Sequence, residues 1–300
     1  MDVIKAHGTG NDFVVLLDVD DRLEVPVALV RALTDRRLGV GGDGVIRLGA
    51  PPVDQPDADV FMDYRNADGT TAEMCGNGVR VTAKLAVDHG LVTPHDGEVV
   101  RVATRAGTKP VVVHLGVDGR VEQVSVDMGP PILTPADVPF TTDRPDLLVH
   151  DLDVDGTVLP VSVVSMGNPH AVTLVDDVST APVTTIGPLV EVHPRFPAKV
   201  NVGFAEVVDR STIRLRVWER GVGETAACGT GACAAVVALQ RLDRVDDRVE
   251  VHLPGGVLEI THTDGGTVTM RGPATEVATV HLTDDWLAAA DGTPVAAASA

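Results

Sequence analysis

The stretch Glu73-Met74-Cys75-Gly76-Asn77-Gly78 decides the fold, together with its repeat Glu224-Thr225-Ala226-Ala227-Cys228-Gly229-Thr230-Gly231. Each places a cysteine before Gly-polar-Gly, and a run typical of a helix follows. A cysteine there lies at the helix N-terminus, beside free backbone N–H groups and the positive end of the helix dipole. This setting favours the thiolate, and the same N–H groups can bind a carboxylate.

The two cysteine stretches indicate an internal duplication. Asn66 precedes Cys75 by the same interval at which Glu219 precedes Cys228, and about half the chain separates the two cysteines. One activatable thiol in each half predicts two domains that face each other across a cleft. The two thiols would then approach one ligand from opposite sides.

The strand pattern divides the chain after residue 128. Residues 1–128 form the expected first domain, and residues 129–270 form the second, because Gly129-Pro130-Pro131 interrupts the alternating strands. A last strand and a terminal helix within 271–300 return to complete the first domain. Residues after about 292 are expected to form a frayed tail.

Helices are predicted from apolar spacing and from their starting residues. The remaining apolar stretches alternate like half-buried antiparallel strands. The expected helices cover residues 26–36, 76–89, 183–192 and 229–241, and a last one starts at 284.

Composition limits the functions that this chain can have. Hydrophobic residues make up 44% and aromatic residues 3%, so Val, Leu, Ala and Ile must build the core. A net charge of −19 argues against nucleic acid and anionic membranes as partners. The absence of a signal-like or bilayer-spanning apolar run, with three cysteines in no pairing pattern, predicts a cytoplasmic protein.

Paired thiols suit the inversion of a stereocentre by proton transfer. A thiolate on one face of a carbon removes the proton, and a thiol on the other face delivers one. A free cysteine is usually a small buried hydrophobe, but two copies at corresponding places favour catalysis. Cys233 lies inside a helix of small residues, where core packing is the better interpretation. The chain lacks a fourfold Cys/His set for a metal.

Several polar residues can assist the thiols, and each has a local alternative. His170 and Glu219 are candidates to tune the thiols, but His170 could cap a loop and Glu219 could pair with Arg220 at the surface. Four asparagines could bind an amino-acid head group or could cap turns: Asn11, Asn66, Asn168 and Asn201.

The chain resembles diaminopimelate epimerases over nearly its whole length. The matching motifs are His7-Gly8-Thr9-Gly10-Asn11-Asp12-Phe13, Met62-Asp63-Tyr64-Arg65-Asn66-Ala67-Asp68-Gly69, Met74-Cys75-Gly76-Asn77-Gly78-Val79-Arg80, Gly167-Asn168-Pro169-His170, Val200-Asn201, Glu219-Arg220-Gly221-Val222-Gly223-Glu224-Thr225 and Cys228-Gly229-Thr230-Gly231.

The resemblance implies an α/β (α+β) fold of two pseudo-symmetric domains, each a curved, mostly antiparallel sheet or barrel around a central helix. It implies interconversion of LL- and meso-2,6-diaminopimelate without pyridoxal phosphate or metal, in lysine and peptidoglycan precursor biosynthesis. It also implies a homodimer.

The resemblance assigns roles residue by residue. Cys75 and Cys228 match the catalytic thiols, and His170 and Glu219 match the groups that tune them. The α-carboxylate site matches the backbone N–H groups of Gly76, Asn77, Gly229 and Thr230. The family residues that bind the substrate's amino groups and its distal carboxylate correspond to Asn11, Asn66, Asn168, Asn201, Glu219 and Arg220.

One position departs from the family pattern. Many members carry Gln where this chain has Gly44, and glycine has no side chain to contact the substrate.

Three alternatives remain open. A proline racemase also pairs thiols, but typically has His at the place of Asn77 and Ser-Pro at the place of Ala226-Ala227. A non-catalytic ligand-binding relative of the same fold would lack the cysteine pair. A Cys-His hydrolase using His170 would leave one thiol redundant.

We predict that Cys75→Ala or Cys228→Ala abolishes epimerisation while the fold stays intact, because one thiol serves each face of the carbon. Cys233→Ala is the matched control and should retain most of the activity. Epimerase assays and circular dichroism on the three variants test this. An inactive, folded Cys233→Ala beside an active Cys75→Ala would contradict the assignment.

Overall fold

The computed structural model describes residues 1–290, in two compact units. Of the described residues, unit 1 contains Met1–Val126 and 273–290, and unit 2 contains Asp127–Gly272. The tail expected after residue 292 lies outside the described residues. None of the helices within residues 1–290 is both long and apolar enough to span a membrane.

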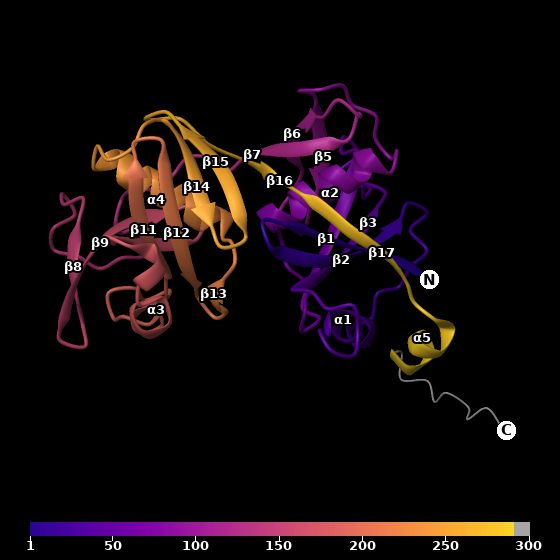
Figure 1. Cartoon of the computed structure of the whole chain (residues 1–300), viewed down its shortest axis with the longest axis horizontal. Coiled ribbons are helices and arrows are strands. Elements are labelled where there is room, and N and C mark those ends of the chain that lie inside the picture. The colour runs from indigo at the N-terminus through magenta and orange to yellow at the C-terminus, as the bar shows by residue number, and fades with distance from the viewer. Residues whose placement is uncertain (291–300) are drawn as a thin grey trace. The chain divides into compact units, whose positions relative to one another are not determined.

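Unit 1 is a curved sheet with a helix at its centre (Figure 1). The strand order is β17-β1-β2-β3-β4-β5-β6-β7, with parallel pairs only at β2–β3 and β4–β5 among the described residues. The elements are β1 (Asp2–Gly8), β2 (Asn11–Asp18), α1 (Val27–Thr34), β3 (Gly44–Gly49), β4 (Val60–Asn66), α2 (Gly76–Asp88), β5 (Val99–Ala103), β6 (Lys109–Leu115), β7 (Val121–Asp127), β17 (Thr275–His281) and α5 (Asp284–Ala290).

Unit 2 repeats this architecture. Its strand order is β8-β9-β10-β11-β12-β14-β15-β16, and β10–β11 and β12–β14 are its parallel pairs. The elements are β8 (His150–Val154), β9 (Thr157–Ser165), β10 (Pro169–Leu174), the 3-10 turn η1 (Val178–Thr180), α3 (Val183–Glu191), β11 (Asn201–Asp209), β12 (Thr212–Glu219), β13 (Gly223–Thr225), α4 (Gly229–Arg241), β14 (Arg248–Leu253), β15 (Gly256–His262) and β16 (Val268–Pro273).

The two ladders place parallel and antiparallel pairs in the same order. In both units a helix follows the third strand of the ladder (α1 after β2, α3 after β10), and another helix lies between the fifth strand and the sixth (α2 and α4). The predicted fold class, pseudo-symmetric and mostly antiparallel with a central helix, is confirmed.

The central helices are enclosed by strands, so most of their residues are buried. Nine of the thirteen residues of α2 and nine of the thirteen of α4 are buried. In α4 these are Gly, Ala, Cys, Val and Leu, because only small side chains let strands approach a helix from several sides. Fully buried Arg80 of α2 donates to Thr9 Oγ1 (2.5 Å), Asn77 Oδ1 (2.8 Å) and the Pro273 carbonyl (3.3 Å).

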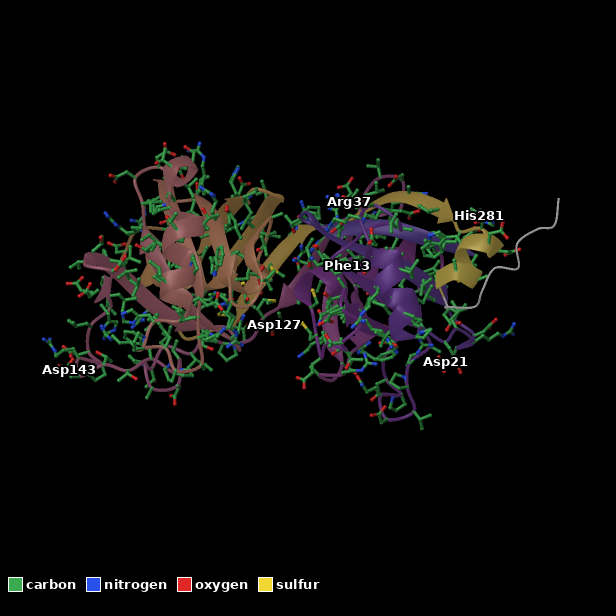
Figure 2. All side chains as sticks on the ribbon, turned by 90° about the horizontal axis from the view of Figure 1, so that it is seen from below. Phe13, Asp21, Arg37, Asp127, Asp143 and His281 are labelled. Atoms are coloured by element: carbon green, nitrogen blue, oxygen red, sulfur yellow. The ribbon has the colours of Figure 1, made fainter. Side chains whose placement is uncertain are left out.

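Burial alternates along strands such as β8 and β14, which separates core from surface there, whereas β2 has a continuous run of buried residues. Phe13 of β2 is fully buried among the strands of unit 1, whereas Asp21 and His281 project outward (Figure 2). Strand β8 is an element that the sequence analysis did not predict. Its charged residues Asp151 and Asp153 are exposed, whereas Leu152 between them is buried.

Candidate active site

Cys75 and Cys228 occupy the same position at the starts of the two central helices. Each is the residue before the first helical turn, with extended backbone angles: φ −145° and ψ 116° at Cys75, and φ −124° and ψ 109° at Cys228. Their carbonyl oxygens accept the first helical bonds, from Val79 N and Ala232 N, both at 2.9 Å. The N–H groups of Gly76, Asn77, Gly229 and Thr230 therefore lie in the first helical turns, where the helix itself supplies no acceptor.

The second glycine of each motif makes room for its thiol-bearing residue. A Cβ atom at Gly78 would lie 3.5 Å from Cys75 Cβ and 3.2 Å from Met62 Sδ. A Cβ atom at Gly231 would lie 3.3 Å from both Cβ and Sγ of Cys228. Steric fit thus explains why both motifs end in glycine.

Asn11 connects the first thiol to the loop before β3. Its Oδ1 accepts from Cys75 Sγ (3.7 Å) and from Asn77 Nδ2 (3.2 Å). Its Nδ2 donates to Asp43 Oδ2 at 2.7 Å. Since the Asp43 carboxylate only accepts hydrogen bonds, it keeps the amide N–H₂ of Asn11 on its own side and the amide oxygen towards Cys75.

Asp43 is itself held by a charged cluster. It accepts from Arg36 Nη2 (2.8 Å) and from the backbone N–H of Asp12 (3.2 Å). Asp12 binds both Arg36 and Lys5, and these cations hold its carboxyl pKa well below the ordinary range, although burial acts in the opposite direction. The sequence analysis missed Asp43 and Arg36, and the glycine-rich loop around Asp43 was the available signal.

The second thiol has a different environment. Cys228 is 5% exposed, and its Sγ lies 3.5 Å from Thr230 Oγ1. Burial raises the pKa of this thiol, and the Glu219 carboxylate raises it further. Thr225 Oγ1 donates to Glu219 Oε1 at 2.5 Å. The prediction that the helix N-terminus favours a thiolate is therefore wrong for Cys228, where desolvation outweighs the helix dipole.

His170 is buried and neutral in unit 2. Its ring is 1% exposed, and Nε2 lies 3.1 Å from Asn168 Oδ1. Burial, together with the positive charge of Arg220, lowers the pKa of His170 to about 3. A neutral ring with its proton on Nε2 donates to the asparagine oxygen.

Asn201 of β11 joins the first residue of β10 to the residue that follows β12. Its Nδ2 donates to the Pro169 carbonyl (3.2 Å), and its Oδ1 accepts from Arg220 N (2.9 Å). Asn201 also lies opposite His170 in the parallel β10–β11 ladder. The Arg220 guanidinium donates to the Ala198 carbonyl at 2.9 Å.

The side chain of Asn66 caps its own turn in this structure. Its Nδ2 donates to Thr70 Oγ1 (3.0 Å), which is the turn-capping alternative, and it lies opposite Gly44 in the β3–β4 ladder. A Cβ atom at Gly44 would lie 2.4 Å from Arg65 O and 2.5 Å from Tyr64 Cε2. Position 44 therefore has no space for a side chain in this chain.

The predicted residues thus form two clusters. Unit 1 brings together Asn11, Cys75 and Asn77, and unit 2 brings together Asn168, His170, Asn201 and Arg220, with Glu219 beside Cys228. The described residues include no group of three or more His, Cys, Asp or Glu side chains arranged to hold a metal ion. The available chemistry is proton transfer by thiols beside helix N-termini.

Comparisons of the sequence with known proteins identify its family. A sequence model of the diaminopimelate epimerase family matches residues 3–134 and 162–277. The diaminopimelate epimerase of Acidovorax ebreus (strain TPSY) is 48% identical over 287 residues, covering 91% of this chain and 94% of the relative. That of Laribacter hongkongensis (strain HLHK9) is 49% identical over 278 residues, covering 91% and 95%.

Solved structures share the fold at low sequence identity. A hydroxyproline epimerase from Agrobacterium vitis is 18% identical, with a TM-score of 0.62 over 97% of this chain and 98% of the other. A PhzF-family phenazine biosynthesis protein from Bacillus anthracis is also 18% identical, with a TM-score of 0.65 over 94% and 99%. These structures show the fold that the chain adopts.

We expect alkylation of Cys228 by iodoacetamide to keep rising with pH beyond the ordinary thiol pKa of 9.0, because burial and Glu219 raise the pKa of Cys228. Glu219→Gln removes one of the two causes and so lowers this pKa. A fall of about one unit gives roughly tenfold more thiolate near neutral pH. Peptide mapping by mass spectrometry measures the rate at Cys228 alone.

Glu224→Gln is the matched control. Glu224 pairs with Arg216 at 2.7 Å, so its loss removes the same charge from a different ion pair of unit 2. Equal rates of Cys228 alkylation in both variants and in the wild type would exclude Glu219 as a cause of the raised pKa.

Proposed function

The chain belongs to the diaminopimelate epimerase family, and from that premise we propose that it interconverts LL- and meso-2,6-diaminopimelate. The observation that carries the proposal is the repeated helix start, with one cysteine in the same backbone geometry in each unit. Such a reaction supplies precursors for lysine and peptidoglycan, and thiol acid–base chemistry needs neither pyridoxal phosphate nor a metal.

We propose that each thiol serves one face of the substrate α-carbon. A thiolate removes the α-proton, and a thiol on the other face returns a proton to the carbanion, so the stereocentre is inverted. Cys228, whose pKa is raised, is suited to be the acid in one direction. Cys75, which is more exposed, is then the base once its S–H proton has left, and the roles exchange in reverse.

The helix N-termini support this chemistry electrostatically. The N–H groups of Gly76, Asn77, Gly229 and Thr230 are candidates to bind the α-carboxylate, because first-turn donors and the helix dipole both favour an anion. The same donors stabilise the negative charge that develops when the α-proton leaves.

Arg220 is the proposed partner of the distal carboxylate. It donates to a carbonyl oxygen, and in the described residues no carboxylate compensates its charge. A substrate carboxylate would form a charge-assisted pair with it, which is stronger than a bond to a neutral oxygen. Asn201 supports Arg220 by accepting from its backbone N–H.

The remaining polar residues are proposed to bind the amino groups and to tune the thiols. Glu219 raises the pKa of Cys228, and neutral His170 donates to Asn168. Asn11 and Asn66 are the proposed contacts from unit 1, and Asn66 would have to exchange its bond to Thr70.

We also propose that the two units are the catalytic domains and that the protein is a cytoplasmic homodimer. Three cysteines with no pairing pattern in the sequence suit a reducing compartment. The homodimer rests on family membership.

Incubation with LL-diaminopimelate in deuterated water tests the function directly. Proton transfer by thiols predicts formation of the meso isomer together with deuterium at the inverted α-carbon, both observable by NMR and mass spectrometry. Inversion without deuterium uptake would exclude this mechanism, and a trapped acyl-enzyme would favour the hydrolase alternative.

We predict that Asp43→Asn lowers kcat/KM roughly fivefold, the effect of losing about 1 kcal/mol of hydrogen bonding at this partly exposed site. Donors converge on both carboxylate oxygens of Asp43, so an amide would place an N–H₂ group against either Arg36 or Asn11. Asn11 would then lose its fixed orientation towards Cys75. Kinetics with diaminopimelate and the rate of Cys75 alkylation are the two measurements.

Asp20→Asn is the control, because Asp20 forms an exposed pair with Arg22 at 3.2 Å. It should leave both the kinetics and the alkylation rate unchanged. Wild-type Cys75 reactivity and kcat/KM in Asp43→Asn would show that Asp43 does not position Asn11.

A further inference from the structure

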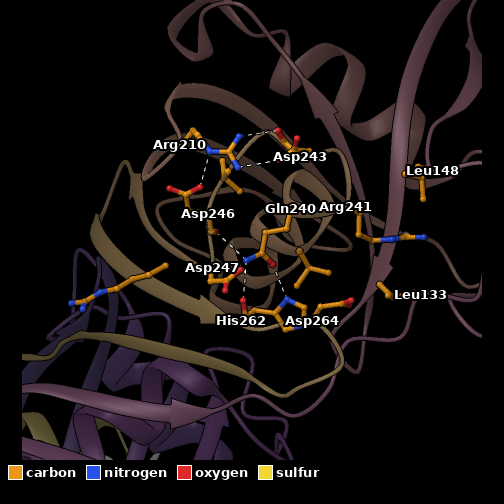
Figure 3. A pocket seen from close by; sticks show the side chains of 13 residues that line it. Leu133, Leu148, Arg210, Gln240, Arg241, Asp243, Asp246, Asp247, His262 and Asp264 are labelled. Carbon is orange, nitrogen blue, oxygen red and sulfur yellow. Dashed lines mark hydrogen bonds and ion pairs between the residues drawn. The ribbon is translucent and has the colours of Figure 1, made fainter.

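Unit 2 contains a polar pocket at the C-terminal end of α4 (Figure 3). Its volume is about 880 Å³, within the range of small-molecule sites. All of its lining residues belong to unit 2. Cys228 lies at the other end of α4, and thirteen helical residues at 1.5 Å each separate the two ends by about 20 Å. The pocket is therefore distinct from the candidate active site.

Arg241 supplies an uncompensated cation to this pocket. Burial lowers the pKa of its guanidinium, and within residues 1–290 no carboxylate is paired with it. Neighbouring Arg210 contrasts with it, because Arg210 binds Asp243 (3.0 Å) and Asp246 (2.7 Å). Figure 3 shows these bonds around Arg210. A half-buried arginine without a counter-ion is a suitable partner for a ligand carboxylate.

His262 forms a hydrogen-bond-accepting part of the wall. Gln240 Nε2 donates to the carbonyls of Asp246 and His262, both at 3.0 Å, so Gln240 Oε1 is the acceptor for His262 Nδ1 at 2.7 Å. The proton of the neutral ring is thus on Nδ1, and Nε2 is a buried acceptor with no partner in the described chain. Burial lowers the pKa of His262, which keeps the ring neutral.

Two carboxylates flank this histidine. Asp247 and Asp264 both line the pocket and both act electrostatically on the His262 ring. In the described residues neither side chain forms an ion pair. This wall therefore offers acceptors and negative charge, whereas Arg241 offers donors and positive charge.

We propose that this pocket binds a small basic amino acid. Its carboxylate pairs with Arg241, and its ammonium groups lie at the wall formed by Asp247, His262 and Asp264. The one carboxylate and two ammonium groups of such a ligand balance the charges of Arg241, Asp247 and Asp264. Leu133 and Leu148 also line the pocket and can cover the carbon chain. The proposal does not depend on the epimerase reaction.

Calorimetric titration of the full chain with L-lysine tests the proposal, since L-lysine carries one carboxylate and two ammonium groups. Glutarate and 1,5-diaminopentane each keep only one kind of group and should bind at least tenfold more weakly. Arg241→Gln and Asp264→Asn should each weaken L-lysine binding tenfold or more. Arg244→Gln is the matched control, because Arg244 is exposed, lies outside the lining and removes the same charge.

Epimerase kinetics on the same variants separate this site from the active site. Arg241→Gln should keep kcat/KM within twofold of the wild type. Unchanged L-lysine affinity in both Arg241→Gln and Asp264→Asn would place the bound L-lysine elsewhere and overturn the proposal. If glutarate bound as tightly as L-lysine, the pocket would be a simple anion site. If L-lysine did not bind at about 10 mM, a binding free energy weaker than about 3 kcal/mol, the pocket would not be a site for it. Asp264 is exposed, so its variant remains informative if Arg241→Gln fails to fold.

Discussion

The enclosure of each central helix by a curved sheet is the constraint on which the rest of the structure depends. A helix surrounded by strands can carry only small or fully satisfied side chains, as the Ala-rich α4 and the buried Arg80 of α2 show. It must also begin abruptly, with extended backbone leading directly into the first turn. Cys75 and Cys228 occupy that point, so the geometry that closes the core also sets a thiol beside free N–H groups.

Identical backbone positions do not give the two thiols identical chemistry. Cys228 is buried beside the Glu219 carboxylate, and both effects raise its pKa. Cys75 is more exposed and donates to the Asn11 amide, which a cluster of Asp43, Arg36 and Asp12 orients. One thiol of the pair must hold a proton while the other does not, and burial beside Glu219 favours Cys228 as the protonated member.

The charge of the chain as a whole opposes an anionic substrate. With a net charge of −19, binding of a dicarboxylate has to rely on local groups. The helix N-termini and Arg220 are the groups proposed for this role. Glu219 is the carboxylate that raises the pKa of Cys228. Arg241 shows the same principle at the far end of α4, where a cation without a counter-ion lines a separate pocket.

The sequence by itself determined the duplication, the family and the helix starts, because Cys-Gly-polar-Gly before a small-residue helix is a local pattern with a local steric cause. It also predicted α4 at about residues 229–241, where the structure has it. Only the tertiary structure revealed that Asp43 orients Asn11, that Asn66 caps its own turn, and that Gly44 has no space for a side chain. The protonation preference of Cys228 was likewise decided in three dimensions, since burial and a carboxylate from another strand oppose the helix dipole. These features depend on contacts between residues far apart in the chain, which no local spacing encodes.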